Sequence, residues 1–275
     1  MNESSSVFDV SDKVAVVTGA LGLLGREHCA ALAAAGAQLV VTDLNADALG
    51  ALAARSREAG ALDALAVACD LTLPGDVARL RAAVLERFGR IDVLVNNAAI
   101  DDKVGPGPDS ADELRFENYS VERFRRQLDV NVTGVFLCCQ QLGSLMAERG
   151  SGSIINVAST YGVVAPNQDL YRGADGQQSF WKGAAYPASK GAVLQLTRFL
   201  AAYWGERGVR VNALCPGGVE AGQDAYFRAR YAERTPLRRM AAPSDYHGAL
   251  LFLASDASAY MTGASLMVDG GFTIW

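Results

Sequence analysis

Short apolar segments alternate along the chain with longer segments that are amphipathic or rich in alanine. The short segments carry many β-branched residues and predict strands, whereas the longer ones predict helices. The predicted strands cover residues 13–19, 38–43, 64–70, 91–99, 152–158, 209–214 and 264–268. The predicted helices cover residues 23–37, 45–60, 74–89, 120–149, 184–207 and 243–255.

Strands that are apolar throughout, each followed by a helix, are typical of a parallel sheet covered on both faces. Right-handed crossovers then give a doubly wound arrangement. We therefore expect an α/β fold with a seven-stranded parallel sheet in one domain, residues 13–275, after a tail at residues 1–12. Long irregular stretches near 100–118, 163–183 and 215–240 are expected at the ligand-binding edge of the sheet.

Composition and charge narrow the possible partners. The chain has 275 residues, half of them hydrophobic, with a net charge of −5, so no basic surface for nucleic acid is expected. The N-terminus lacks the pattern of a signal peptide, and no uncharged apolar run is long enough to span a bilayer. We expect a cytoplasmic protein without a membrane or metal partner. Its cysteines, expected to be reduced core residues, are Cys29, Cys69, Cys138, Cys139 and Cys215.

The segment "TGALGLLG" (18–25) joins the first predicted strand to the first predicted helix. Its glycines allow close backbone approach, and the following helix N-terminus suits a pyrophosphate, although tight turns also use glycine for structural reasons alone. Asp43 ends the second predicted strand, 24 residues after Gly19, where a carboxylate can bind the adenosine ribose hydroxyls or be a simple turn residue. It would repel the 2′-phosphate of NADP, and residues 42–53 contain no Arg or Lys. We therefore predict NAD as the cofactor.

The segment "YPASK" places Tyr186 and Lys190 four positions apart on a predicted helix, among small residues. Positions i and i+4 share one helix face, so a phenol and an ammonium lie side by side. A free tyrosine has a pKa of about 10, and a nearby cation favours the phenolate. The pair therefore suits general acid–base chemistry, although the same spacing alone is also typical of a solvated helix face.

Several motifs, in order along the chain, resemble those of the short-chain dehydrogenase/reductase family, whose fold is the Rossmann type. The resemblance runs from Lys13 to about Gly271. One departure is the glycine spacing Gly19-x-x-Gly22-x-x-Gly25, which is more like that of the family's sugar-nucleotide epimerases and dehydratases. The motifs are "TGALGLLG", "CDLT" (69–72), "VNNAA" (95–99), "VNVTG" (130–134), "INVAST" (155–160), "YPASK" (186–190), "CPGGV" (215–219) and "VDGG" (268–271).

The resemblance implies an NAD-dependent enzyme that interconverts a secondary alcohol and a ketone. Tyr186 would be the general acid/base, and Lys190 would tune its pKa and hold the nicotinamide ribose. Ser159 would bind the substrate oxygen, and Asn131 would support a water relay. Ala221 lies where relatives often have a threonine that binds the carboxamide. The implied cofactor contacts are Gly19, Leu23, Leu24, Gly25, Asp43, Leu44, Asp70, Leu71, Asn97, Ala98, Ala99, Tyr186, Lys190, Pro216, Gly217 and Val219.

The family resemblance further implies a homotetramer or homodimer, packed through the helices at 120–149 and 184–207 and the last strand. Ser159 and Tyr186 are 27 positions apart, more than is usual in the family. The extra stretch, 167–183, and the stretch 217–240 are polar and aromatic, which suits a sugar, polyol or sugar acid better than a steroid or fatty chain. The expected substrate contacts are Tyr161, Gln168, Tyr171, Trp181, Glu220 and Gln223.

Three alternatives stay open at this point. The chain could be an epimerase or dehydratase with tightly bound NAD, as the glycine spacing suggests, although it lacks the length for a separate substrate domain. It could sense a dinucleotide without catalysis, although Ser159, Tyr186 and Lys190 are all present. Its substrate could instead be a hydrophobic alcohol or carbonyl compound.

Overall fold

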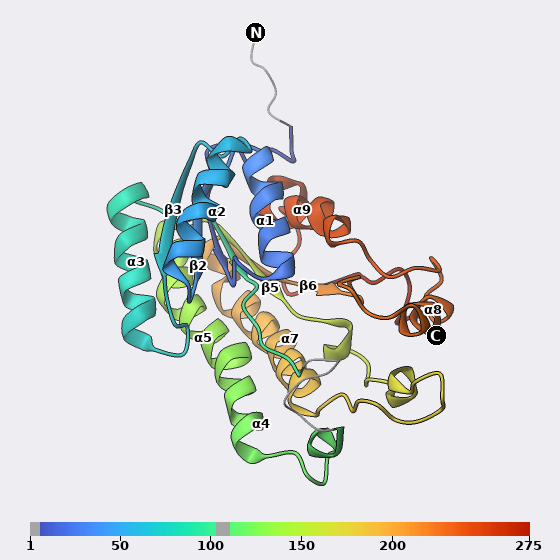
Figure 1. The fold of residues 1–275 in the computed structure, drawn as a ribbon. Helices are drawn as coiled ribbons and strands as arrows, with labels where there is room; N and C mark the ends of the chain where they lie inside the picture. The colour runs from blue at the N-terminus through green and yellow to red at the C-terminus, as the bar shows by residue number, and fades with distance from the viewer. Residues whose placement is uncertain (1–5, 103–110) are drawn as a thin grey trace.

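Seven parallel strands form a single sheet in the order β3-β2-β1-β4-β5-β6-β7 (Figure 1). The computed structural model describes residues 6–102 and 111–275; the first part of the predicted tail and part of the stretch 100–118 lie outside these ranges. The predicted doubly wound sheet is confirmed. Its strands are β1 (Val14–Thr18), β2 (Gln38–Asp43), β3 (Asp63–Ala68), β4 (Val93–Asn96), β5 (Gly152–Val157), β6 (Val209–Pro216) and β7 (Ser265–Val268).

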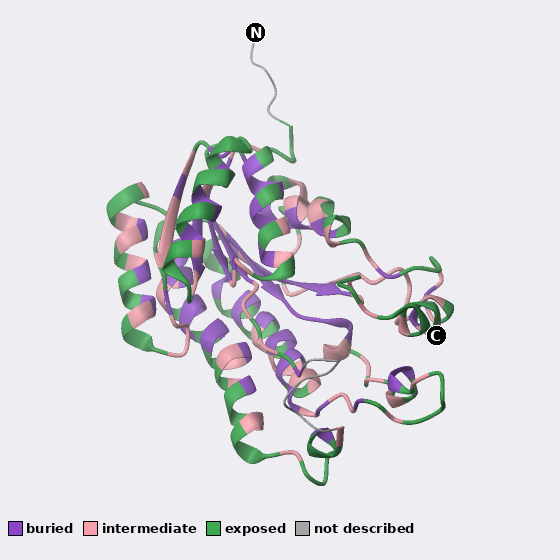
Figure 2. Ribbon diagram, in the orientation of Figure 1, coloured by how far each residue is buried: buried purple, intermediate pink, exposed green. Residues whose placement is uncertain are grey.

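Helices cover both faces of the sheet, because alternate side chains of each strand point to opposite sides. Val14 and Val16 of β1 face the core beneath α3, α5, α6 and α7, whereas Ala15 and Val17 face the core beneath α1, α2 and α9. Figure 2 shows the sheet buried between these layers. The helices are α1 (Leu23–Ala34), α2 (Ala46–Glu58), α3 (Pro74–Phe88), α4 (Val121–Leu128), α5 (Gly134–Cys138), α6 (Ser144–Arg149), α7 (Ala185–Trp204), α8 (Ala225–Glu233) and α9 (His247–Ala254).

The helix predicted over 120–149 contains two π-helical turns, Asp129–Thr133 and Cys139–Gly143, between α4, α5 and α6. Among the described residues, this helix is long and apolar enough to cross a membrane. However, 56% of its most apolar window is buried inside the protein, and its apolar side chains join the core shared with α7. It is therefore packed as a core helix.

The stretch 215–240 is not irregular throughout, as the sequence predicted, because it contains α8. Asp224 caps this helix by accepting a hydrogen bond from the Phe227 N–H at 2.9 Å. Tyr231 is the one fully buried residue of α8, so its sequence lacks the apolar stripe that usually reveals a helix.

The insertion at 163–183 docks onto α8. The ring of Tyr171 packs against Phe180 at 5.1 Å and against Phe227 of α8 at 5.6 Å between ring centroids. Arg230 of α8 donates a hydrogen bond to the main-chain carbonyl of Asp169. Two segments far apart in the sequence thus form one lobe at the carboxyl edge of the sheet (Figure 1).

The five cysteines are buried and free, as predicted. The core also buries His28 of α1 completely, and neither ring nitrogen has a hydrogen-bond partner. Burial lowers the pKa of His28 to about 4, and the nearby His247 lowers it further in the same direction. The folded protein therefore holds this imidazole neutral.

We expect His28 to make the fold sensitive to mild acid. In the unfolded chain His28 binds a proton near pH 6.5, whereas in the folded chain it binds one only near pH 4. The free energy of unfolding therefore falls as the pH drops through this window. In a His28→Leu variant, about 2 kcal/mol of the loss of unfolding free energy between pH 7 and pH 5 should disappear. Urea unfolding at both pH values measures it. An equal loss in the variant and the wild type would contradict this assignment.

Candidate active site

Two adjoining cavities lie along the carboxyl edge of the sheet. The larger, about 780 Å³, lies between the loops that follow β4, β5 and β6 and the lobe formed by the insertion and α8. The smaller, about 590 Å³, lies between the glycine loop, the end of β2 and α4. Leu24, Asn97 and Ala99 line both cavities. Together the cavities form one elongated cleft where doubly wound sheets bind their ligands.

The glycine loop is packed so tightly at Gly19 and Gly25 that neither position admits a side chain. Gly19 has a φ of 61°, and a Cβ there would lie 2.6 Å from the Ala98 Cα. A Cβ on Gly25 would lie 2.1 Å from the Gly19 carbonyl oxygen. Helix α1 begins after Gly22 with no side-chain cap and no acidic residue in its first turn. Its first N–H groups thus suit an anionic group, which fits the pyrophosphate of a dinucleotide.

Asp43 is fixed at the end of β2. Its carboxylate accepts hydrogen bonds from the N–H groups of Leu21 at 3.0 Å and Leu44 at 2.7 Å. It lines the smaller cavity beside Leu44, Asp70 and Leu71, so these four predicted cofactor contacts line one cavity together.

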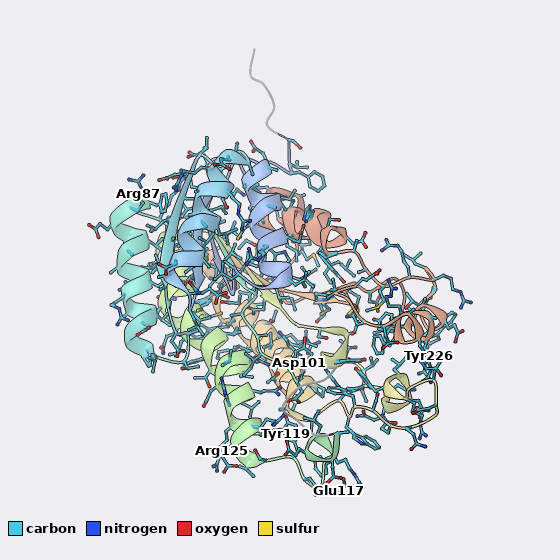
Figure 3. The ribbon with its side chains drawn as sticks, viewed as in Figure 1. Arg87, Asp101, Glu117, Tyr119, Arg125 and Tyr226 are labelled. Atoms are coloured by element: carbon cyan, nitrogen blue, oxygen red, sulfur yellow. The ribbon has the colours of Figure 1, made fainter. Side chains whose placement is uncertain are left out.

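Two arginines of α4 were missed by the sequence reasoning. Arg125 and Arg126 line the same cavity as Asp43, and Figure 3 shows Arg125 projecting from α4. The sequence prediction considered cations near Asp43 in the chain only. Tertiary packing brings α4 to this site from more than eighty positions away, which no local pattern shows.

The predicted cofactor residues divide into those that line the cleft and those that support it. Pro216, Gly217 and Val219 line the larger cavity. Asn97 does both, because it lines both cavities and its side-chain NH₂ donates to the carbonyls of Thr18 at 2.9 Å and Gly19 at 3.0 Å. Gly25 lines neither cavity, and its role is to let α1 pack against the loop.

Ser159, Tyr186 and Lys190 line the larger cavity together. Tyr186 and Lys190 lie one turn apart on α7, with the Lys190 Nζ 5.6 Å from the Tyr186 ring centroid. The Lys190 ammonium donates to the Val157 carbonyl at 2.7 Å. Burial lowers the pKa of Lys190 to about 8, an effect that the Asp101 carboxylate partly opposes.

The acidity expected for Tyr186 is not found in this structure. Burial, and then the negative charge of Asp101, raise the pKa of its phenol, whereas a hydrogen bond with Ser159 opposes the rise. Burial of the phenol is the largest of these effects, and the tuning of Tyr186 by Lys190 stays a prediction. The sequence could show the Tyr–Lys spacing but not the desolvation.

Asn131 is buried in the first π-helical turn and lines neither cavity. Its carbonyl oxygen accepts from the Ile100 N–H at 2.8 Å, and its NH₂ donates to the Ile100 carbonyl at 2.9 Å and the Ser189 Oγ at 3.0 Å. These bonds tie the long helix to the loop after β4 and to α7. The predicted water relay remains a prediction, and the side chain itself has a tethering role.

Three of the six predicted substrate residues line the larger cavity, namely Tyr161, Tyr171 and Gln223. The other three do not. Gln168 bonds both main-chain groups of Lys182, Trp181 packs beside the aromatic cluster of the lobe, and Glu220 pairs with Arg228. For these residues the expectation of a direct substrate contact finds no support in the cavity lining, because other protein groups occupy their side chains.

Gln223 organises the loop near Ala221. Its side-chain oxygen accepts from the Ala221 N–H at 2.8 Å, and its NH₂ donates to the Val219 carbonyl at 3.0 Å. This side chain thus shapes the loop in which relatives often place a threonine.

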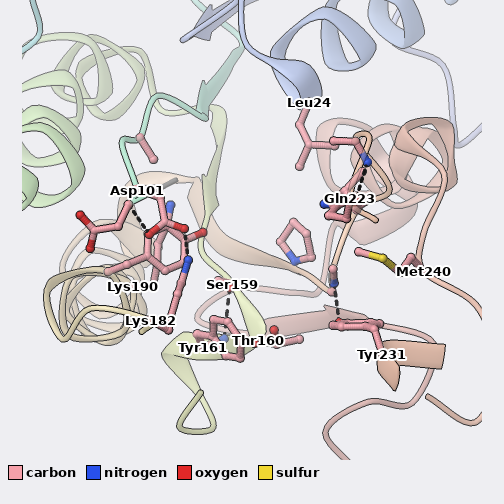
Figure 4. Close-up of a pocket in the computed structure, with 18 of the residues that line it drawn as sticks. Leu24, Asp101, Ser159, Thr160, Tyr161, Lys182, Lys190, Gln223, Tyr231 and Met240 are labelled. Atoms are coloured by element: carbon pink, nitrogen blue, oxygen red, sulfur yellow. Dashed lines mark hydrogen bonds and ion pairs between the residues drawn. The ribbon is translucent and has the colours of Figure 1, made fainter. Parts of the chain in front are cut away.

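Asp101 and Lys182 form an ion pair in the larger cavity that the sequence reasoning did not assign to the site (Figure 4). Asp101 follows β4 closely, and an acidic residue just beyond a strand end was an available signal. Lys182 stands in the insertion, where nothing in the sequence places it against Tyr186. Its Nζ lies 4.6 Å from the Tyr186 ring centroid.

The fold is a doubly wound α/β sheet, and its cleft brings a glycine loop beside a tyrosine, a lysine and a serine. The family model described as "Enoyl-(Acyl carrier protein) reductase" matches residues 19–273. The chain is 37% identical to a galactitol 2-dehydrogenase (L-tagatose-forming) of Cereibacter sphaeroides over 276 residues, covering 98% of both chains. It is 38% identical to a D-threitol dehydrogenase of Mycolicibacterium smegmatis, covering 97% of this chain and 95% of the relative.

Among solved structures, a gluconate 5-dehydrogenase from Burkholderia cenocepacia in complex with NADP and tartrate superposes with a TM-score of 0.83 at 31% identity, covering 98% of both chains. The chain therefore belongs to the short-chain dehydrogenase/reductase family. It is an oxidoreductase of the alcohol/ketone type, and its family binds a nicotinamide dinucleotide.

Proposed function

We propose that this protein oxidises a secondary alcohol of a polyol, sugar or sugar acid to the ketone with NAD, and that Tyr186 is the general acid/base. The observation that supports this most strongly is the meeting of Ser159, Tyr186 and Lys190 in a cavity that adjoins the dinucleotide cleft. Relatives named for galactitol and D-threitol act on polyhydroxylated alcohols, which supports the same substrate class.

Each member of the trio has a separate role in the proposed reaction. The Ser159 hydroxyl holds the substrate oxygen beside the Tyr186 phenol, which takes the proton of the alcohol or returns it to the ketone. The Lys190 ammonium stabilises the phenolate, because the two groups share one face of α7. Bound nicotinamide supplies the redox chemistry, and the protein supplies position and electrostatics. The proposed dinucleotide site is bordered by the glycine loop, Asp43, Asn97 and Pro216.

The choice of NAD rests on Asp43. Its carboxylate, fixed at the end of β2, can accept hydrogen bonds from ribose hydroxyls and repels a 2′-phosphate. Arg125 and Arg126 line the same cavity and are the groups that would favour NADP instead. We propose a homotetramer or homodimer in the cytoplasm as the working form, by resemblance to the family.

Purified protein assayed with galactitol, D-threitol and gluconate tests the proposal, with NADH or NADPH absorbance as the readout. We expect turnover of at least one of these substrates, and kcat/KM for NAD about tenfold or more above that for NADP, because the 2′-phosphate meets a carboxylate. A preference for NADP would overturn the cofactor assignment and point to the two arginines.

Other outcomes of this assay favour the alternatives. Turnover of hydrophobic secondary alcohols but none of the three polyhydroxylated compounds would overturn the substrate class. Retained NAD with no net NADH release would favour an epimerase or dehydratase. Dinucleotide binding without turnover of any alcohol or ketone would favour a sensing protein.

A further inference from the structure

An ion pair beside the proposed general base is built into the larger cavity. Lys182 has only 7% of its side chain exposed, and its ammonium pairs with the carboxylate of Asp101, of which 33% is exposed. The same ammonium lies over two tyrosine rings, 4.6 Å from the Tyr186 centroid and 5.9 Å from that of Tyr161. The pair thus lies beside the phenol of the proposed general acid/base.

Dedicated contacts hold Lys182 in this place. Gln168 accepts from the Lys182 N–H at 2.9 Å and donates to the Lys182 carbonyl at 3.0 Å. Gln178 then holds Gln168, because its NH₂ donates to the Gln168 carbonyl at 2.8 Å. Two side-chain amides of the insertion therefore fix the main chain from which the ammonium projects.

The neighbouring Asp102 is not part of this pair. Its carboxylate accepts from the Tyr119 hydroxyl at 2.8 Å and from the Gln127 NH₂ at 3.0 Å, and it pairs with Arg123 at 3.4 Å. Only 4% of its side chain is exposed. Asp102 supports the wall of the cavity, and Asp101 is the carboxylate that faces Lys182.

Both lysines of the larger cavity already have protein partners. The described residues that line it include the lysines Lys182 and Lys190 and the aspartates Asp101, Asp102 and Asp224. Lys182 is already neutralised by Asp101, and Lys190 donates to a main-chain carbonyl. A substrate carboxylate would have to displace Asp101 to pair with Lys182, whose side chain is only 7% exposed. Neutral hydroxyls can instead donate to Asp101 and accept from Lys182.

From this arrangement we infer that Asp101 and Lys182 bind the hydroxyl groups next to the reacting carbon and select neutral polyols over sugar acids. The inference rests on the proposed function and narrows its substrate class. Asp101 provides the selectivity, because it pairs with the Lys182 ammonium that a substrate carboxylate would otherwise bind. Lys182 is the donor to a neighbouring hydroxyl oxygen, and Gln168 is a positioning residue behind it.

Substitution of the carboxylate tests the inference through the ratio of kcat/KM for galactitol to that for gluconate, at saturating cofactor. The wild type should favour galactitol. Asp101→Asn should lower this ratio about tenfold or more, because the freed ammonium gains a carboxylate partner. The double variant Asp101→Asn, Lys182→Met should reverse that shift, because no ammonium remains. Asp169→Asn, a matched change at an exposed position of the insertion outside the cavity, should leave the ratio unchanged.

Three results would overturn the inference: a wild type that prefers gluconate, a ratio in Asp101→Asn within about twofold of the wild type, or a shift that persists in the double variant. If Asp101→Asn does not fold, Lys182→Met alone decides, with a loss in galactitol kcat/KM of about tenfold expected and no loss contradicting it. If the wild type turns over D-threitol but not galactitol, D-threitol takes the place of galactitol in the ratio. Turnover of none of the three compounds is a failure of the proposed function and not of this inference.

Discussion

Replacing Tyr186 by phenylalanine should lower kcat about a thousandfold while dinucleotide binding stays intact, because positioned proton transfer contributes about a hundred- to ten-thousandfold. The substitution removes one oxygen from a cavity wall and leaves the ring in place. Steady-state kinetics on the best polyol and dinucleotide titration by fluorescence measure the two effects separately. Turnover within about tenfold of the wild type would remove Tyr186 from the mechanism.

Tyr203→Phe is the matched control, since Tyr203 lies on the same helix, 64% exposed, with its ring stacked on Phe199. It should leave kcat unchanged. The raised pKa of Tyr186 adds a second readout, because burial and Asp101 hold the phenol protonated. Alcohol oxidation needs the phenolate, so its rate should rise with pH above neutrality. A rate independent of pH in this range would contradict the assignment.

Replacing Gly25 by alanine should abolish measurable dinucleotide binding and destabilise the fold by about 2–4 kcal/mol, because overpacking of this severity displaces backbone. The new Cβ would lie 2.1 Å from the Gly19 carbonyl oxygen and 2.9 Å from the Ala20 Cα, so no rotamer change can relieve the contact. Urea unfolding and dinucleotide titration measure the two effects.

Gly50→Ala provides the control. Gly50 is an exposed residue in α2, and a Cβ there meets no atom within 4 Å. Since alanine is the better helix former, this variant should gain about 0.5–1 kcal/mol and bind the dinucleotide normally. Equal behaviour of the two variants would show that the glycine loop tolerates a side chain, contrary to the packing described above.

Local sequence patterns correctly predicted much of this fold, and the features that they missed can be identified. The strands and the Tyr186–Lys190 pair depend on residues close in sequence, and the structure has them where the pattern indicates. Helix α8 was missed because its surface is mostly polar. The pair of Asp101 and Lys182 joins positions 81 residues apart, which only tertiary packing reveals.

The electrostatic state of the site was the least accessible feature from sequence. The spacing of Tyr186 and Lys190 correctly places the two side chains on one helix face. It says nothing of the burial that raises the pKa of the phenol or of Asp101, which reaches the site from the loop after β4. To predict the direction in which the pKa of Tyr186 shifts, the burial of the phenol must be known as well as the identity of its neighbours.

Tyr171 of the insertion and Phe227 of α8 pack against each other, and this contact joins the two walls of the larger cavity. Exchanging the insertion alone for one from another enzyme would uncover the partly buried ring of Phe227, and full burial of an aromatic side chain is worth about 1.5–3 kcal/mol. A graft that also carried α8 would keep the interlock. To redesign the substrate specificity of this scaffold, the insertion and α8 should therefore be exchanged together.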